Sequence, residues 1–239
     1  NRDMSRGLPP GRNRSVQVTF ERRYRGPLKS ANGGYACGRL AAFVGADEVE
    51  VTLRLPPPLD RPLTVEDGGD SVRLLDGDAV VAEARPAHLE LELPGPVSVA
   101  VAEEARSLHV RVGNPDFAEC FTCGTRGADV GLGVYVGSVE SREPLHAAPW
   151  VVHESGPEIV WAAIDCPGAY AVGAAGRGDI VLGRMTARVD RVPEIGDTCV
   201  ITAWPLEEDG RKLFAGTALF SEDGELLALA RQVWIVPRS

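Results

Sequence analysis

The sequence predicts an α+β fold made of two divergent copies of one helix-and-strand unit that share a common sheet. In the first half, alternating apolar residues indicate strands on both sides of a helix rich in small residues. The same order of elements returns in the second half. A short turn also repeats, as Asp76-Gly before residues 79–85 and as Asp223-Gly before residues 226–236. The chain therefore nearly repeats itself.

The first half begins with an alternating strand and then a helix that opens with Gly-Gly. A second alternating strand follows and stops at the triple proline that starts at Pro56, because proline donates no hydrogen bond to a sheet. The expected elements are strands over 16–20, 49–55, 79–85 and 88–93, and a helix over 32–44.

The second half predicts a helix followed by four strands. The hairpin near residues 207–210 is longer than its counterpart, so the offset between the copies is not constant. The expected elements are a helix over 158–174 and strands over 180–189, 199–204, 213–220 and 226–236.

Between the copies we expect an inserted connection with two strands and a Gly-rich loop. Those strands are expected over 97–101 and 108–112. The division that follows is a disordered tail over 1–15, a first repeat over 16–93, a connection over 94–146 and a second repeat over 147–239.

A helix wrapped by four or five antiparallel strands, made twice, is the double-hotdog arrangement: two helix-wrapped antiparallel sheets that form a pseudo-dimer in one chain. The Ala and Gly of the first helix suit this arrangement, because bulky residues would not fit inside the curl of the sheet. Two unrelated α+β units are the alternative.

Composition limits the function classes. The net charge of -9 argues against a nucleic-acid partner, which needs clustered cations. No stretch approaches the roughly 18 apolar residues of a membrane span. Five cysteines, an odd number in a chain long enough to build its own core, indicate a reducing compartment, so we expect a cytoplasmic protein.

Several segments resemble a bacterial family of thioesterase-like double-hotdog proteins. The resemblance covers residues 117–236 well, and the first half mainly through Asn32-Gly-Gly-Tyr. It implies a fold more strongly than an activity. The matching segments are 117–124, 131–133, 147–150, 160–168, 182–184, 216–220 and 230–235.

Hotdog thioesterases carry a Gly-Gly turn at the start of the central helix and an Asp further along it, and the resemblance extends this pattern to the present chain. A backbone N–H at the turn polarises the thioester carbonyl, while the carboxylate acts as nucleophile or general base. Asn32, Gly33 and Gly34 match the turn, but Ala41 stands where the Asp belongs. In the second copy Asp165 matches the carboxylate.

The second copy has lost the turn instead, since Gly156-Pro157-Glu158 replaces it. Each copy keeps what the other lacks, which predicts one composite site per chain and a second, inactive pocket. The composite site is expected to combine the Gly34 N–H and Asn32 of the first copy with Asp165 of the second. The alternative is that Asp165 only caps a helix that starts at Cys166, with Pro167 in its first turn.

Cys120 and Cys123 form a Cys-x-x-Cys pair followed by glycine, the spacing of a structural zinc knuckle. Tetrahedral zinc needs two further ligands. These would have to come from distant residues: Cys166, Cys199, His109, His146 or His153. A redox couple and ordinary packing cysteines are the alternatives.

Arg39 and Arg184, with Arg188, are candidate ligands for the phosphates of coenzyme A, although arginines on strands are usually only solvated. The resemblance implies an acyl-coenzyme A thioesterase that acts on a small-molecule acyl thioester, requires no cofactor and associates further with itself. A hotdog that binds an acyl or aromatic ligand without catalysis is the alternative. A hydratase would pair its Asp with a nearby His, which the sequence lacks.

Overall fold

The computed structural model describes residues 16–126, 130–177 and 179–238. The segment 1–15, expected to be a disordered tail, lies outside the described residues. Within them no helix is long and apolar enough to cross a bilayer.

The strands form a single eleven-stranded sheet in which neighbouring strands among the described residues run antiparallel. The first repeat contributes β1 (Val16–Thr19), β2 (Glu48–Leu53), β3 (Pro62–Asp67), β4 (Val72–Asp76) and β5 (Ala79–Pro86). The connection contributes the short edge strand β6 (Gly137–Ser138). The second repeat contributes β7 (His146–Val151), β8 (Val181–Val189), β9 (Thr198–Asp209), β10 (Lys212–Ser221) and β11 (Leu226–Ile235).

The strand order shows the internal repeat directly. Across the sheet it reads β1-β3-β4-β5-β2-β8-β11-β10-β9-β7-β6. Outward from the junction, β2-β5-β4-β3-β1 on one side corresponds to β8-β11-β10-β9-β7 on the other. The two halves meet where β2 pairs with β8, with Val51 opposite Met185. The prediction of a double hotdog, with its two halves sharing one sheet, is confirmed.

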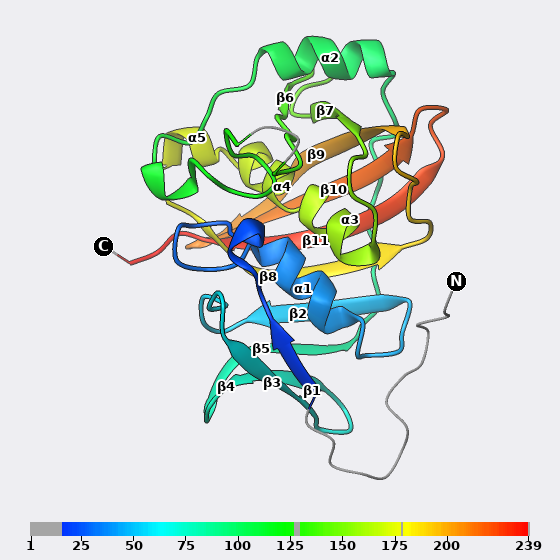
Figure 1. Cartoon of the computed structure of the whole chain (residues 1–239). Helices are drawn as coiled ribbons and strands as arrows, with labels where there is room; N and C mark the ends of the chain where they lie inside the picture. The colour runs from blue at the N-terminus through cyan, green and yellow to red at the C-terminus, as the bar shows by residue number, and fades with distance from the viewer. Residues whose placement is uncertain (1–15, 127–129, 178, 239) are drawn as a thin grey trace.

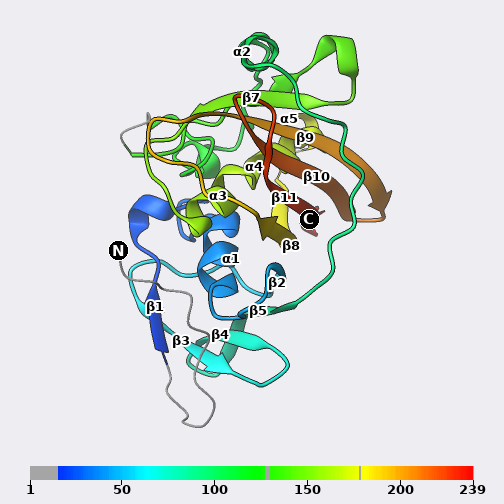
Figure 2. The same ribbon diagram turned by 90° about the vertical axis from the view of Figure 1, so that its right-hand side faces the viewer.

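The central helices lie side by side against the sheet (Figure 1). The first repeat supplies α1 (Gly33–Ala41), and the second supplies α3 (Pro157–Ala163), α4 (Cys166–Ala171) and α5 (Ala174–Arg177). Figure 2 shows the strands of the second repeat curving around α3 and α4. Short 3-10 turns lie at Arg22–Tyr24, Pro115–Phe117 and Glu140–Arg142.

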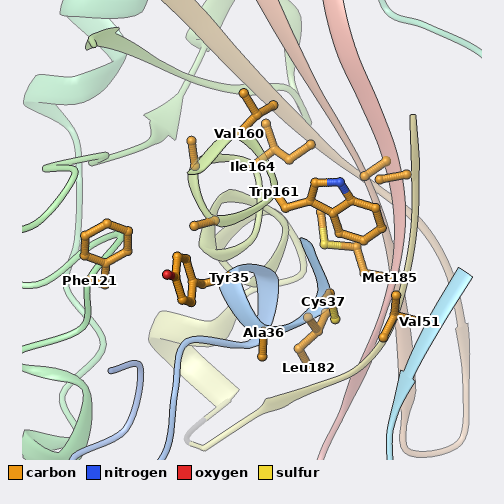
Figure 3. Packing of buried hydrophobic residues seen from close by; sticks show 14 of the residues in the cluster. Tyr35, Ala36, Cys37, Val51, Phe121, Val160, Trp161, Ile164, Leu182 and Met185 are labelled. Carbon is orange, nitrogen blue, oxygen red and sulfur yellow. The ribbon is translucent and has the colours of Figure 1, made fainter. Parts of the chain in front are cut away.

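The main core fills the space between these helices and the junction strands (Figure 3). Cys37 of α1, Trp161 of α3 and Met185 of β8 are all buried in this cluster. The helices approach closely because glycines line the contact. A Cβ at Gly38 would lie 2.7 Å from the Glu158 Cα and 2.9 Å from the Trp161 Cβ.

Three expected strands are wrong. Residues 88–93 and 108–112 form no strand, and 97–101 fall partly within α2 (Val99–Ser107). Ser98 begins this helix by accepting a hydrogen bond from the Val101 N–H. Its buried residues Ala102 and Ala105 join a second cluster on the sheet that also contains Leu89. The alternating apolar residues of segments 88–93 and 97–101 therefore pack on the face of the sheet and do not pair as strands within it.

The expected helix over 158–174 is interrupted. Pro167 has no N–H to bond the carbonyl of Ala163, so α3 ends and α4 begins at Cys166. Strands β3 and β4, which complete the first repeat, were not predicted from the sequence.

Candidate active site

The start of α1 is fixed by Asn32. Its side-chain Oδ1 accepts a hydrogen bond from the Tyr35 N–H at 2.9 Å, which makes it the N-cap of the helix. The residue is only 1% exposed. This cap leaves the N–H groups of Gly33 and Gly34 at the positive end of the helix.

The interruption between α3 and α4 places Asp165 against that helix end. Gln232 of β11 holds the broken backbone, since its Nε2 donates to the carbonyls of Ile164 at 2.6 Å and Asp165 at 3.2 Å. Thr122 of the connection does the same for Ala162, with its hydroxyl 2.7 Å from the carbonyl oxygen. Both residues are fully buried. The bend is therefore stabilised by side chains from two other segments.

The Asp165 carboxylate contacts the first repeat. Its Oδ2 accepts hydrogen bonds from Asn32 Nδ2 at 2.9 Å and from the Gly34 N–H at 3.0 Å. Its Oδ1 is buried and has no hydrogen-bond partner among the described residues. Asp165 occupies the N-cap position of α4, but its side chain makes no capping hydrogen bond there. The structure thus brings Asn32, Gly34 and Asp165 together.

Burial raises the pKa of Asp165 to about 7. The Gly34 N–H and the Asn32 amide oppose this shift, because hydrogen bonds to the carboxylate favour its charged form, while the neighbouring Cys120 adds to it.

Gly34 allows the contact sterically. A Cβ at this position would lie 2.4 Å from the Trp161 carbonyl oxygen and 2.5 Å from the Asp165 Cβ. Gly33 is different: its N–H has no hydrogen-bond partner among the described residues. The Gly34 N–H, expected from the sequence to meet the substrate carbonyl, instead donates to the Asp165 carboxylate. The Gly33 N–H is therefore the donor left for a ligand.

A cavity of about 330 Å³ opens beside this carboxylate. Its walls are mainly apolar and come from both repeats and from the connection. They include Leu53 of β2 and Leu182 of β8, on the two strands that join the repeats. The polar groups at the cavity are Ser30, Asn32, Arg54, Cys120, Asp165 and Cys166.

The arginines expected to bind phosphate lie elsewhere. Arg39 donates a hydrogen bond to the Tyr35 hydroxyl at 3.1 Å, and Arg184 donates to the Thr52 hydroxyl at 3.0 Å. Neither lines the cavity. Arg188 pairs with Glu48 at 3.0 Å. Among the described residues, Arg54 is the cationic side chain that lines the cavity.

Cys120 and Cys123 lie at the same site, next to Cys166. The Cys120 and Cys166 sulfurs are 3.6 Å apart. Hydrogen bonds from the Cys123 and Cys166 thiols lower the pKa of Cys120. The pKa values of Cys123 and Cys166 are correspondingly raised, chiefly by Cys120. Of the distant ligands considered for zinc, Cys166 is the one that joins the pair.

The two-repeat sheet defines the fold as a double hotdog. Its candidate site, at the interface between the repeats, combines a buried carboxylate with a cavity of about 330 Å³. No family model and no curated protein matches the chain. Several solved structures match the chain over nearly the whole length of both proteins. They include an acyl-CoA thioesterase II from Mycobacterium marinum, with 11% identity, TM-score 0.60 and coverage of 99% of this chain and 97% of that one.

A hotdog-fold protein of unknown function from Alicyclobacillus acidocaldarius matches with 13% identity, TM-score 0.62 and the same coverage of 99% and 97%. The pyran synthase domain from module nine of the sorangicin pathway matches with 12% identity, TM-score 0.57 and coverage of 98% and 97%. These similarities establish the fold. Because proteins named for different activities share that fold, the chemistry must be argued from the site.

Proposed function

We propose that the chain hydrolyses an acyl-coenzyme A thioester at one composite site between its repeats. The observation that carries the proposal is the Asp165 carboxylate at the cavity. One of its oxygens is held by the first repeat, and the other lacks a partner among the described residues. A buried base that is oriented on one side and free on the other is suited to accept a proton from water.

The reaction is addition of water followed by loss of thiolate. Asp165 removes a proton as the water oxygen bonds to the thioester carbonyl carbon. The carbonyl electron pair moves onto its oxygen, which the Gly33 N–H and the positive end of α1 stabilise. When this intermediate collapses, the carbon–sulfur bond breaks and the proton passes to the leaving sulfur. The products are a carboxylic acid and the coenzyme A thiol.

The walls of the cavity suit the acyl part of such a substrate. Leu53, Leu182 and Trp234 line it, and apolar contact of this kind is how small-molecule sites gain most of their affinity. Arg54 lines the cavity with a side chain that is 55% exposed, and its guanidinium is paired with Glu83 at 2.7 Å. A coenzyme A phosphate would bind Arg54 by sharing or displacing that carboxylate.

One site per chain follows from what each copy lacks. Ala41, at the end of α1, replaces the carboxylate in the first copy. Pro157 begins α3, and its ring nitrogen carries no hydrogen to donate. A pocket related to the first by the internal repeat would therefore have neither the base nor the donor.

The test is an assay against short, medium, long and aromatic acyl-coenzyme A thioesters, with wild-type protein beside Asp165→Asn. The amide is nearly isosteric and still accepts hydrogen bonds from Asn32 and Gly34, so the fold should persist. Removal of the base should lower kcat by roughly a hundredfold or more. Asp223→Asn, on an exposed turn, is the matched control.

Hydrolysis by wild type and the control but not by Asp165→Asn supports the proposal. Equal rates for all three would retain a thioesterase but exclude Asp165 as its base. Saturable binding of the thioesters without hydrolysis would favour the ligand-binding alternative.

A further inference from the structure

Three cysteines from two segments converge beside the cavity. The sulfurs of Cys120, Cys123 and Cys166 all lie within 4.8 Å of one another. Cys120 and Cys123 come from the connection, whereas Cys166 is the first residue of α4. None of the three is in a disulfide. Their convergence is a product of the tertiary fold, because 46 positions of sequence separate Cys120 from Cys166.

The spacing of these sulfurs fits a tetrahedral metal. With Zn–S bonds of about 2.3 Å, two thiolates on one zinc ion lie about 3.8 Å apart. The Cys120 and Cys166 sulfurs, at 3.6 Å, are already near this distance. Closing the group around an ion therefore needs only small side-chain rotations.

The loop that carries the pair makes a tight turn. The Gly124 N–H donates to the Cys120 carbonyl at 2.8 Å, which closes a tight turn around the two cysteines. A Cβ on Gly124 would lie 2.4 Å from that carbonyl oxygen and 2.5 Å from the Cys120 nitrogen. Only glycine fits this position, which explains the Cys-x-x-Cys-Gly sequence.

A buried amide lies close to two of the sulfurs. Asn32 Nδ2 lies 3.8 Å from the Cys120 sulfur and 3.9 Å from the Cys166 sulfur. Amide N–H groups near metal-bound thiolates stabilise their charge and orient them, as outer-shell partners do at metal sites. The same amide holds Asp165, so the cysteine group and the carboxylate share one positioning residue.

The cysteine group leaves one coordination position for an outside ligand. Among the described residues, no fourth His, Cys, Asp or Glu belongs to the group. Cys120 and Cys166 line the cavity, but Cys123 does not. Cys123 instead lines a second hollow of about 130 Å³ beside Tyr170. The cavity beside Asp165 is the larger of these two spaces and is shared by two of the three sulfurs, so water or a bound ligand there can complete the tetrahedron.

We propose that Cys120, Cys123 and Cys166 bind one Zn²⁺ ion, with its fourth position directed into the cavity. Three thiolates in a tetrahedral arrangement select zinc over the oxygen-preferring Mg²⁺ and Ca²⁺. The ion ties the connection to the start of α4 and, through Asn32, to the start of α1. This site does not depend on the hydrolase proposal, because a ligand-binding hotdog would hold the same ion.

Metal analysis of the full chain tests the site directly. Protein purified under reducing conditions without chelator should contain one zinc ion per chain. Replacement of zinc by Co²⁺ should give the near-ultraviolet thiolate-to-metal absorption and the intense visible bands of a tetrahedral thiolate site. Wild-type protein gives this reading by itself, so the result does not depend on the folding of a variant.

Cys123→Ser is the informative variant, because Cys123 is the ligand that does not line the cavity. It should weaken zinc binding at least tenfold in a competition with a chromogenic chelator. Cys199→Ser, at another buried cysteine on β9, should keep one zinc per chain. Wild-type protein that binds neither Zn²⁺ nor Co²⁺ stoichiometrically, or a Cys123→Ser protein that binds zinc as wild type does, would overturn the proposal.

Discussion

Replacing Gly34 with alanine should both destabilise the protein and slow hydrolysis. The new methyl group would lie 2.4 Å from the Trp161 carbonyl oxygen and 2.5 Å from the Asp165 Cβ. Neither neighbour is the flexible end of a side chain, so α1 and the α3–α4 bend must move apart. Overpacking of this kind costs about 1–3 kcal/mol, and we expect a value near the upper end.

The same displacement lengthens the hydrogen bond from the Gly34 N–H to Asp165, now 3.0 Å. A base displaced by about 1 Å can lose roughly a hundredfold in rate. The free energy of unfolding would be measured by urea titration with circular dichroism. The rate of thiol release would be measured at a temperature where the variant remains folded.

Gly176→Ala is the matched control. Gly176 lies in α5, and a methyl group added there would meet no atom within 4 Å, so alanine should be neutral or stabilising by up to about 1 kcal/mol. A Gly34→Ala protein within about 0.5 kcal/mol of wild type and with the wild-type rate would refute the close-contact reasoning.

Three further variants probe other parts of the site. Gln232→Ala leaves the carbonyls of Ile164 and Asp165 without their buried donor and should cost about 3 kcal/mol in chemical denaturation; a change under about 1 kcal/mol would contradict that role. Arg54→Ala should raise KM for acyl-coenzyme A severalfold with little change in kcat, and an unchanged KM would remove Arg54 from phosphate binding. Leu53→Phe fills part of the cavity and should shift the preferred substrate to shorter acyl chains, so an unchanged chain-length profile would place the acyl group elsewhere.

Much of the fold could be predicted from local pattern. Strands β2 and β8 follow alternating or apolar runs, and α1 begins where an Asn that can cap a helix precedes Gly-Gly. These signals depend on neighbours in sequence, which is why a single chain reveals them. The repeat itself was visible as the same order of elements in both halves.

The predictions from sequence are wrong where tertiary contacts decide the secondary structure. Residues 97–101 alternate like a strand, yet Ser98 caps a helix there and Ala102 packs on the sheet. The sequence allows Pro167 as a first-turn residue, yet the predicted helix over 158–174 runs through it, whereas α3 ends at Ala163 and α4 begins at Cys166.

Only part of the candidate site can be predicted from the sequence. A Gly-Gly turn and an Asp can be found by motif, and the structure places them in contact. Gln232 and Thr122 carry no motif, because their roles are to satisfy backbone carbonyls that exist only after the helix bends. The contribution of Cys166 to the cysteine group likewise depends on the packing of α4 against the connection.

The most direct test of the composite site is a double-mutant cycle between the repeats, measured as kcat for acyl-coenzyme A hydrolysis. It uses Asn32→Ala from the first repeat and Asp165→Asn from the second, with unfolding curves to confirm that each protein is folded. If both residues serve one reacting centre, the double variant should be no slower than Asp165→Asn alone, because groups that act as a unit are not additive. Losses that multiply independently would show that the two repeats do not share a catalytic site.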